Sequence, residues 1–305
     1  MDTEKNVSPL PELRSLWNYL KPEESERKFR ALLPRAKEEE NLAYFVELIA
    51  HLGRAISLQK KYIEAHEILN KAEPFVTDKM SVAAIQYYLE RGRVYFWQKE
   101  KEKAYKLFIK ALDIAREKEE DLLALDIIHM LAALPEKPED RLPWHLKALD
   151  FLENTSCQKA KQWSATLHSN AGGNYYELGE YNKALQLYKK ALEYRKLQKS
   201  HIGIFQAKFA LARTYRHTKD VETALEIQKN LIDEIENGMD QPIGHIKLEI
   251  AECLLLMGEN EKAKPFFSEA YAFFCNFEWK QSQNFWFSVK QEEIDRMKKL
   301  GEVEN

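Results

Sequence analysis

A set of small and aromatic residues recurs along the chain at a spacing of about 40 residues, and this repeat constrains the fold more than any single motif. In the clearest copy, Gly172 is followed by Tyr175, by a Gly-x-Tyr turn and then by Ala184 and Tyr188. The alanine equivalent to Ala184 recurs at five places: Ala65, Ala104, Ala184, Ala224 and Ala263. Their residue numbers differ by 39, 80, 40 and 39, so the double gap predicts one further copy between Ala104 and Ala184.

Each copy predicts two antiparallel helices joined by a short turn. A small residue such as Gly53, Gly92 or Gly172, with an alanine 12 positions later, lets the two helices approach closely. Apolar residues at three- and four-residue spacing give each helix an inward stripe. Stacked pairs bury their surface only against their neighbours, so a chain of 305 residues needs no single large core.

The copy between Ala104 and Ala184 is irregular. Its first helix is predicted over residues 121–134, and its second helix carries Ala148. Three prolines, Pro135, Pro138 and Pro143, lie between them and forbid a continuous helix. Pro143 suits the first turn of the second helix, because the first helical position needs no N–H donor.

Both ends of the chain predict incomplete units. Residues 10–20 and 23–38 have the pattern of two helices, which would form a partial repeat within residues 1–40. At the other end, the sequence SQNFWFSVKQEEIDRMKKL predicts a last helix with one apolar and one charged side. A repeat array needs such a cap, because an end repeat otherwise exposes its core.

The order of residues in these copies resembles the tetratricopeptide repeat (TPR), with small residues at repeat positions 8, 20 and 27 and aromatic residues at 11, 17 and 24. The resemblance predicts an all-α fold: a right-handed α-solenoid of about six to seven TPR-like helix–turn–helix repeats with a C-terminal capping helix. Residues 1–305 would form a single solenoid, with a partial repeat at 1–40, repeats over 42–275 that are irregular near 121–154, and the capping helix and tail at 276–305. The period exceeds the usual 34 residues, which longer helices or loops would explain.

The charge balance and the apolar pattern exclude several classes of partner. The formal net charge is -3 without a long basic run, whereas a nucleic-acid surface needs clustered basic residues. The first residues lack a signal-peptide pattern, and no apolar run approaches the ~18–20 residues of a membrane span. The cysteines Cys157, Cys253 and Cys275 lie too far apart for a metal-ligand spacing or a paired disulfide framework. We therefore expect a cytoplasmic protein with no nucleic acid, membrane, metal or cofactor.

Motifs of catalysis are incomplete in this chain. The segment HEILN at His66 begins like the zinc-binding HExxH, but Asn70 stands where the second histidine is needed. The glycines of NAGGNYY follow no strand pattern and lack the GxGxxG spacing. Neither a phosphate-binding GxxxxGK(S/T) nor a nucleophile GxSxG occurs. We expect a protein that is not an enzyme.

The resemblance also implies where a partner would bind, because first-helix positions such as 9, 12 and 13 of tetratricopeptide repeats line an inner, concave groove. The residues that we single out for this groove are Arg54, Arg93, Phe96, Trp97, Asn170, Tyr176, Arg213, Arg216 and His217. Arginine binds carboxylates through two parallel hydrogen bonds, and arginine beside aromatic residues is typical of recognition surfaces. The prediction is a groove for a protein or peptide segment that carries acidic side chains or a carboxylate.

Structural roles for the same residues stay open. The arginines would then pair with carboxylates of neighbouring repeats, namely Glu90, Glu177 or Glu252. Phe96 and Phe209 would pack between repeats. Asn170 matches one position of the clamp with which related proteins hold the carboxylate of chaperone C-termini, but the lysines of that clamp are missing here.

The function that these observations predict is a non-catalytic scaffold or adaptor for protein–protein interaction. The alternative is a stand-alone regulator that senses a peptide and acts on a signalling or transcription partner. Only about 40 residues precede the first clear repeat, too few for the extra N-terminal domain that such regulators carry. A subunit that binds through its convex side, and a homo-oligomer, are equally open from the sequence.

Overall fold

The structure is a computed structural model that describes residues 9–38, 41–77, 79–238, 243–275 and 289–303. All regular structure in these ranges is helical, as the sequence predicts. Contacts between residues group the chain into two compact units, Met1–Gln162 and Trp163–Asn305. The single array over residues 1–305 stays a prediction.

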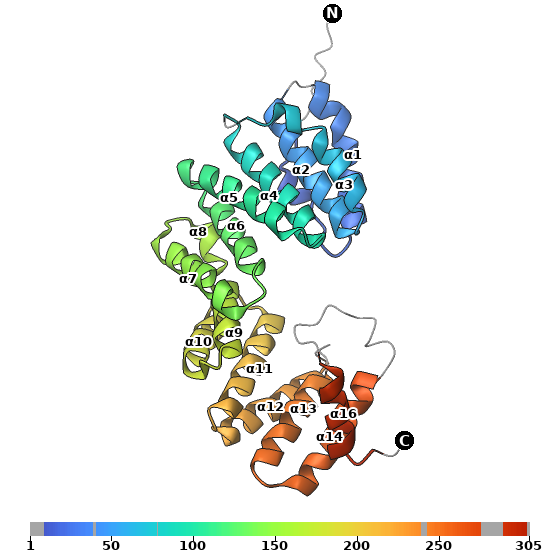
Figure 1. The fold of residues 1–305 in the computed structure, drawn as a ribbon, viewed down its shortest axis with the longest axis vertical. Helices are drawn as coiled ribbons and strands as arrows, with labels where there is room; N and C mark the ends of the chain where they lie inside the picture. Colours follow the sequence, from blue (N-terminus) through green and yellow to red (C-terminus); the bar gives the residue numbers. More distant parts are fainter. Residues whose placement is uncertain (1–8, 39–40, 78, 239–242, 276–288, 304–305) are drawn as a thin grey trace, which may run out of the picture. The chain divides into compact units, whose positions relative to one another are not determined.

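The first unit contains three helix pairs, which follow a short 3-10 helix and one further helix in the chain (Figure 1). Its elements are η1 (Leu13–Leu16), α1 (Pro22–Glu38), α2 (Leu42–Leu58), α3 (Tyr62–Asn70), η2 (Glu73–Phe75), α4 (Ser81–Trp97), α5 (Lys101–Glu117), α6 (Asp121–Ala133), α7 (Pro138–Asn154) and α8 (Gln158–Lys161). The pairs are α2 with α3, α4 with α5 and α6 with α7. The first helices α2 and α4 also pack against each other.

The second unit repeats the same arrangement. Its described elements are α9 (Ser164–Glu177), α10 (Tyr181–Leu197), α11 (His201–His217), α12 (Val221–Glu236), α13 (Ile243–Leu256), α14 (Asn260–Cys275) and α16 (Gln291–Leu300). Helices α9 and α10, α11 and α12, and α13 and α14 form the pairs. Helix α16 packs on α14 and buries Met297 completely, as expected of a cap, while residues 276–288 of the predicted capping segment lie outside the described residues.

Local sequence signals set several of the helix starts. The side chain of Asn41 accepts a hydrogen bond from the backbone N–H of Tyr44 at 3.0 Å and caps α2. Ser200 caps α11 and Asp220 caps α12 in the same way. Such caps satisfy one of the backbone donors that the first turn of a helix leaves without an intrahelical partner.

The close contact within each helix pair lies where the repeat predicts it. A Cβ atom added to Gly92 of α4 would lie 2.5 Å from the ring of Phe108 on α5. The same addition at Gly53 would meet Leu69 at 2.8 Å, and at Gly172 it would meet Tyr188 at 3.0 Å. Glycine therefore permits the second helix to place a large side chain directly on the first, and the predicted repeat register is confirmed.

The turn between the two helices contains a left-handed residue in every described pair except α6 and α7. The residues at this position have φ values of 63° to 77°: Lys60, Lys99, Gly179, Lys219 and Gly258. At Lys99, the N–H of Lys99 donates to the carbonyl of Phe96 at 3.0 Å and the N–H of Glu100 donates to that of Tyr95 at 2.9 Å. Glycine is favoured in this helix-ending motif, because side chains with a Cβ are strained in the left-handed region.

Replacing Lys99 with glycine is expected to raise the free energy of unfolding by about 1 kcal/mol, because the lysine is held at φ 65°. Lys99 is exposed, so little side-chain packing is lost. Urea unfolding followed by circular dichroism measures the change. The reverse substitution at the equivalent turn, Gly179→Lys, should lower the free energy of unfolding by a similar amount. A change of the same sign in both variants would contradict the assignment of a left-handed turn.

The predicted helix over residues 10–20 is wrong. Only the short η1 forms there, and Trp17 has an extended backbone with ψ 134°. The N–H of Asn18 donates to the hydroxyl of Ser25 at 2.7 Å, and the indole Nε1–H of Trp17 donates to Nδ1 of His51 at 3.0 Å. These contacts dock the segment on α1 and α2 as an irregular strap, which a local helical pattern does not reveal.

The irregular repeat between Ala104 and Ala184 exists as α6 and α7, but its second helix starts earlier than predicted. Pro138, not Pro143, occupies the first turn, and Pro143 lies inside α7. A proline there removes the hydrogen bond to the carbonyl of Glu139. Both residues are exposed, so water can satisfy that carbonyl and the helix tolerates the proline.

Candidate binding surface

The residues predicted to bind a partner lie on the first helices of the pairs. Arg54 is on α2, and Arg93, Phe96 and Trp97 are on α4. Gly92 faces the second helix α5, and the next residue, Arg93, points about 100° away around α4. We call the side of the first helices that carries these residues the first-helix face.

In the first unit, Arg54 and Arg93 meet a buried carboxylate. Glu90 of α4 is fully buried, and its Oε1 accepts hydrogen bonds from Nη1 of Arg93 at 2.5 Å and from Nε2 of Gln86 at 2.7 Å. Nη1 of Arg54 lies 3.3 Å from the same oxygen. Arg93 also donates through Nη2 to Oδ1 of Asp126 on α6 at 2.6 Å. The result is a chain of ion pairs that joins α2, α4 and α6.

Arg93 and Asp126 are both charged at neutral pH. Burial acts to lower the pKa of Arg93, but Asp126 and Glu90 outweigh it and raise that pKa above its usual value. Burial acts to raise the pKa of Asp126, but the charge of Arg93 outweighs it and holds that pKa below its usual value. Because Arg93 is buried between two carboxylates of its own chain, it stabilises the contact between first helices.

Aromatic rings of the N-terminal segment lie beside Arg54. The rings of Trp17 and Tyr19 stack with centroids 4.7 Å apart, and the Arg54 guanidinium lies 5.4 Å and 5.2 Å from them. Such cation–π contacts are characteristic of arginine. Sequence reasoning missed Trp17 and Tyr19 because their segment had been assigned to a helix. The prolines on both sides of these residues are the signal that could have indicated an irregular segment.

Phe96 and Trp97 end helix α4. Their rings contact each other edge to face at 5.0 Å, and Phe96 is half-buried while Trp97 is 51% exposed. An exposed tryptophan next to a second aromatic ring is a common anchor in protein interfaces. These two residues are the most accessible large apolar groups among the predicted site residues of the first unit.

In the second unit, two arginines of α11 share one carboxylate of α13. Oε1 of Glu249 accepts a hydrogen bond from Nε of Arg213 at 2.9 Å, and Oε2 accepts one from Nε of Arg216 at 2.8 Å. Burial acts to raise the pKa of Glu249, but Arg216 and Arg213 outweigh it and lower that pKa. The pairing differs from the sequence alternative, because Glu252 binds Arg296 of α16 instead.

Aromatic rings also accompany these arginines. The guanidinium of Arg213 lies 5.1 Å from the ring of Tyr176 on α9, and the ring of His217 contacts Tyr176 at 5.2 Å. The rings of His217 and Tyr181 stack at 4.6 Å. The structure thus brings Tyr176, Arg213 and His217 together, and Tyr181 joins them.

Asn170 lies six residues before Tyr176 on α9 and is half-buried. It occupies repeat position 6, which is also the position of Glu90 and Glu249. The internal ion pairs therefore have a recurring sequence signal: an arginine and, 36 residues later, an acidic residue at repeat position 6. Both Arg54–Glu90 and Arg213–Glu249 have this spacing.

His245 is a buried histidine of the second unit. It lies on α13 between the rings of Phe209 and Phe274, at 6.4 Å and 4.9 Å. Burial, assisted by the charge of Arg213 and opposed by Glu249, lowers its pKa to about 4. An unfolded histidine has a pKa of about 6.5, so the unfolded state takes up the proton first as the pH falls.

The contribution of His245 to the free energy of unfolding is therefore expected to be constant above about pH 6.5 and to fall below it, by about 2 kcal/mol at pH 5. Urea unfolding of His245→Leu at pH 7 and pH 5 should show a pH-dependent loss smaller by that amount. The matched control is His201→Leu, since His201 is exposed on α11. Equal losses in the wild type and His245→Leu would contradict the prediction.

Within the described ranges, no group of three or more His, Cys, Asp or Glu side chains is placed to hold a metal ion. In the same residues, no helix is both long and apolar enough to cross a membrane.

Comparison with known proteins supports the assignment of the repeat. The family model of the tetratricopeptide repeat matches residues 163–233. No curated protein matches the chain as a whole or in part.

Several solved structures are similar in fold. The apo form of RapI matches with a TM-score of 0.71 and 14% identity over 93% of this chain and 82% of that chain. A signal-transduction ATPase with a tetratricopeptide-repeat sensor, from Pyrococcus horikoshii, matches with a TM-score of 0.69 and 18% identity over 92% of this chain. This chain spans only 42% of that ATPase. A tetratricopeptide-repeat protein from Parabacteroides merdae matches with a TM-score of 0.51 and 16% identity, over 95% of this chain and 97% of that chain.

Proposed function

Since this chain is a tetratricopeptide-repeat protein, we propose that it is a non-catalytic scaffold or adaptor that holds a protein or peptide partner on the first-helix face. The observation that carries the proposal is found in both units: an arginine at repeat position 9 lies next to aromatic rings. Arg54 lies beside Trp17 and Tyr19 in the first unit, and Arg213 lies beside Tyr176 in the second. Arginine, tryptophan and tyrosine are the residues most enriched among the energetic centres of interfaces.

The charge of the second cluster favours an acidic partner. Arg213 and Arg216 bring two guanidinium groups together at the carboxylate of Glu249. A carboxylate of the partner would join this cluster through charge-assisted hydrogen bonds. In the first unit the arginines and carboxylates balance, and the exposed ring of Trp97 offers an apolar contact instead.

The test is capture of partners from the lysate of the native cell, with quantification by mass spectrometry. Trp97→Ala removes the exposed ring from the first-helix face. The matched control is Tyr105→Ala, because Tyr105 is 47% exposed, close to the 51% of Trp97, but lies on the second helix α5. We expect the captured amount of at least one partner to fall by about tenfold in Trp97→Ala, which is the effect of losing one anchor residue. The captured amount of the same partner should be unchanged in Tyr105→Ala.

The opposite pattern would move the binding surface to the second helices and contradict the proposal. The alternative function, a stand-alone regulator that senses a peptide, predicts a different dependence. A protein partner would then be captured or released only when a small peptide fraction of the lysate is present. Passing the lysate through a size-exclusion column before capture separates the two functions.

A further inference from the structure

Helix α3 is short for a second helix of this chain. It has nine residues, whereas α5 and α10 have 17 each. Pro74 follows closely, and the chain turns into η2 where the last turns of a longer helix would lie. A proline cannot continue a helix without loss of a hydrogen bond and a clash with the preceding turn. The missing turns leave space beside the N-terminal half of α2.

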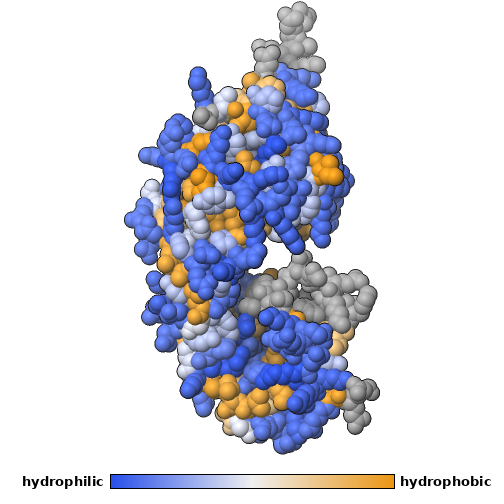
Figure 2. All heavy atoms as spheres, in the orientation of Figure 1, coloured by the Kyte–Doolittle hydropathy of each residue, from blue (hydrophilic) through white to orange (hydrophobic). Residues whose placement is uncertain are grey.

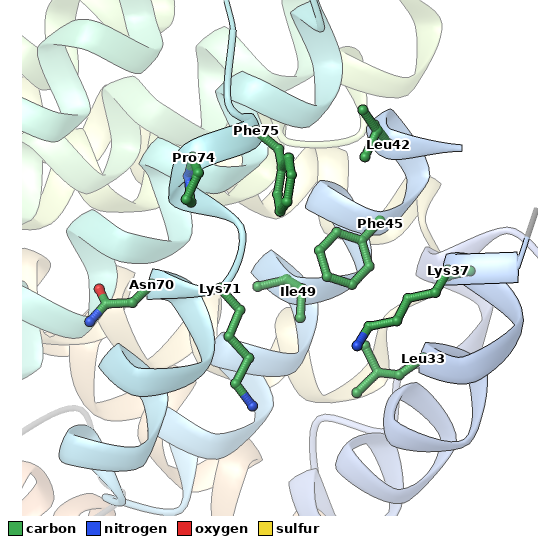
Figure 3. Close-up of a pocket in the computed structure, with 10 residues that line it drawn as sticks. Leu33, Lys37, Leu42, Phe45, Ile49, Asn70, Lys71, Pro74 and Phe75 are labelled. Atoms are coloured by element: carbon green, nitrogen blue, oxygen red, sulfur yellow. The ribbon is translucent and has the colours of Figure 1, made fainter. Parts of the chain in front are cut away.

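That space is a pocket of about 580 Å³ in the first unit. Buried side chains of Ala36 and Ile49 form its inner surface. Three larger apolar side chains converge on it in Figure 3: Leu42 and Phe45 of α2 and Phe75 of η2. The volume is in the range of pockets that hold small molecules, which are mostly apolar with a few placed polar groups.

The polar groups of the pocket are positively charged. Lys37 of α1 and Lys71 after α3 border it from opposite walls, and both are exposed. Figure 3 shows their ammonium groups at the same end of the pocket as Leu33, away from Phe75 and Leu42. No carboxylate is among the described residues that line the pocket. It therefore has an apolar end and a cationic end.

The rim exposes large apolar groups. Leu42 is 46% exposed and Phe75 is 40% exposed, while the rings of Phe75 and Phe45 meet edge to face at 6.1 Å. In the view of Figure 2, hydrophobic residues of the first unit gather in separate patches within a mostly hydrophilic surface. An occupant that covers Leu42 and Phe75 would remove apolar surface from water, which is favourable.

We propose that this pocket binds a small amphipathic carboxylate, a free organic acid with an aliphatic or aromatic body. Its body lies against Phe45, Phe75 and Ile49, and its carboxylate lies between the ammonium groups of Lys37 and Lys71. A peptide is a poorer fit, because its backbone N–H and C=O groups need partners, and three of the described lining residues have polar side chains. A neutral ligand would gain no ion pair with the two lysines, and a cationic ligand would be repelled by their ammonium groups.

The pocket is distinct from the first-helix face. Its α2 residues belong to the first half of that helix, whereas Arg54 lies in the last two turns and contacts Trp17 and Glu90 outside the helix. The two sites need different ligands: an acid buried at its apolar end, and a protein or peptide held by arginine and aromatic side chains. The organic-acid site therefore stands or falls independently of the proposed scaffold function.

Isothermal titration of the full chain with sodium dodecanoate, below its micelle concentration, tests the site. We expect saturable binding at one site per chain, weakened by about tenfold or more in Lys37→Gln/Lys71→Gln because the counter-charges are lost. The control Lys190→Gln/Lys229→Gln removes two exposed lysines from the second unit and should bind as the wild type does. Equal affinities of the two double variants would overturn the proposal.

A second pair of variants tests the apolar end. Phe75→Ser should weaken dodecanoate binding by about tenfold through loss of apolar contact, whereas Leu197→Ser, at a residue 78% exposed on α10, should not. Thermal unfolding verifies that each variant is folded. Dodecyltrimethylammonium, which has the same tail and the opposite charge, should show no saturable binding. Absence of dodecanoate binding to the wild type, or binding of both surfactants alike, would overturn the proposal.

Discussion

Replacing Glu249 with alanine is expected to lower the free energy of unfolding by about 3–5 kcal/mol, the cost of breaking a buried ion pair from one side. Glu249 is buried and accepts hydrogen bonds from both Arg213 and Arg216. Without Glu249, the guanidinium groups of Arg213 and Arg216 lose this carboxylate and remain at the poorly hydrated contact between α11 and α13. The change should appear as a lower urea midpoint with an unchanged slope.

Two further variants separate the loss of charge pairing from the loss of packing. Glu226→Ala removes an exposed carboxylate from α12 and should change stability by less than about 0.5 kcal/mol. The triple change Glu249→Leu, Arg213→Met and Arg216→Met replaces the ionic cluster with apolar groups and should restore most of the stability. A loss below about 1 kcal/mol in Glu249→Ala would mean that the cluster is hydrated and does not join the helices.

Replacing Gly92 with leucine is expected to destabilise the first unit by about 3 kcal/mol, at the upper end of the usual cost of overpacking. Even a Cβ at this position would lie 2.5 Å from the Phe108 ring, and the longer side chain would force α4 and α5 apart. Thermal or urea unfolding measures the loss.

The matched substitution is Gly173→Ala on α9. A Cβ added there meets only the Tyr188 hydroxyl, at 3.4 Å, so the space is open. Alanine in a helix interior is better than glycine by about 0.5–1 kcal/mol, so this variant should be more stable than the wild type. Similar losses in Gly92→Leu and Gly173→Ala would contradict the repeat register.

The repeat architecture was predictable from sequence because it depends on local spacing. The contact of Gly92 with Phe108 and the left-handed turn at Gly179 both follow from positions within one repeat of about 40 residues. The irregular copy was found as well, since the spacing of alanines required it. Its helix start was misplaced because the effect of Pro143 depends on whether the affected carbonyl is hydrated, which is a property of the folded surface.

The candidate site was less accessible to sequence reasoning. Arg54, Arg93 and Arg213 lie on first helices, as the sequence predicts, but each of them also binds a carboxylate 33 to 36 residues further along the chain. Which acidic residue they meet depends on how consecutive first helices pack. The pairing with Glu90 was among the alternatives, whereas Glu249 was not considered.

Some features had no sequence signal of the kind used. The stacked Trp17 and Tyr19 belong to an irregular segment, whose position is set by a hydrogen bond to His51 rather than by periodicity. The apolar pocket beside α2 arises from the early end of α3 at Asn70. The repeat residues Ala65 and Leu69 are present although α3 is short. Only the three-dimensional structure therefore reveals the space that the short helix leaves.

Photo-crosslinking from single positions tests the central claim most directly, that a partner is held on the first-helix face. The amino acid p-benzoylphenylalanine would replace Trp97 on α4 in one variant and Tyr105 on α5 in another; both side chains are about half exposed. After irradiation in the native lysate, we expect a crosslinked partner from position 97 and none from position 105. A crosslink to the same partner from position 105 alone would contradict the account.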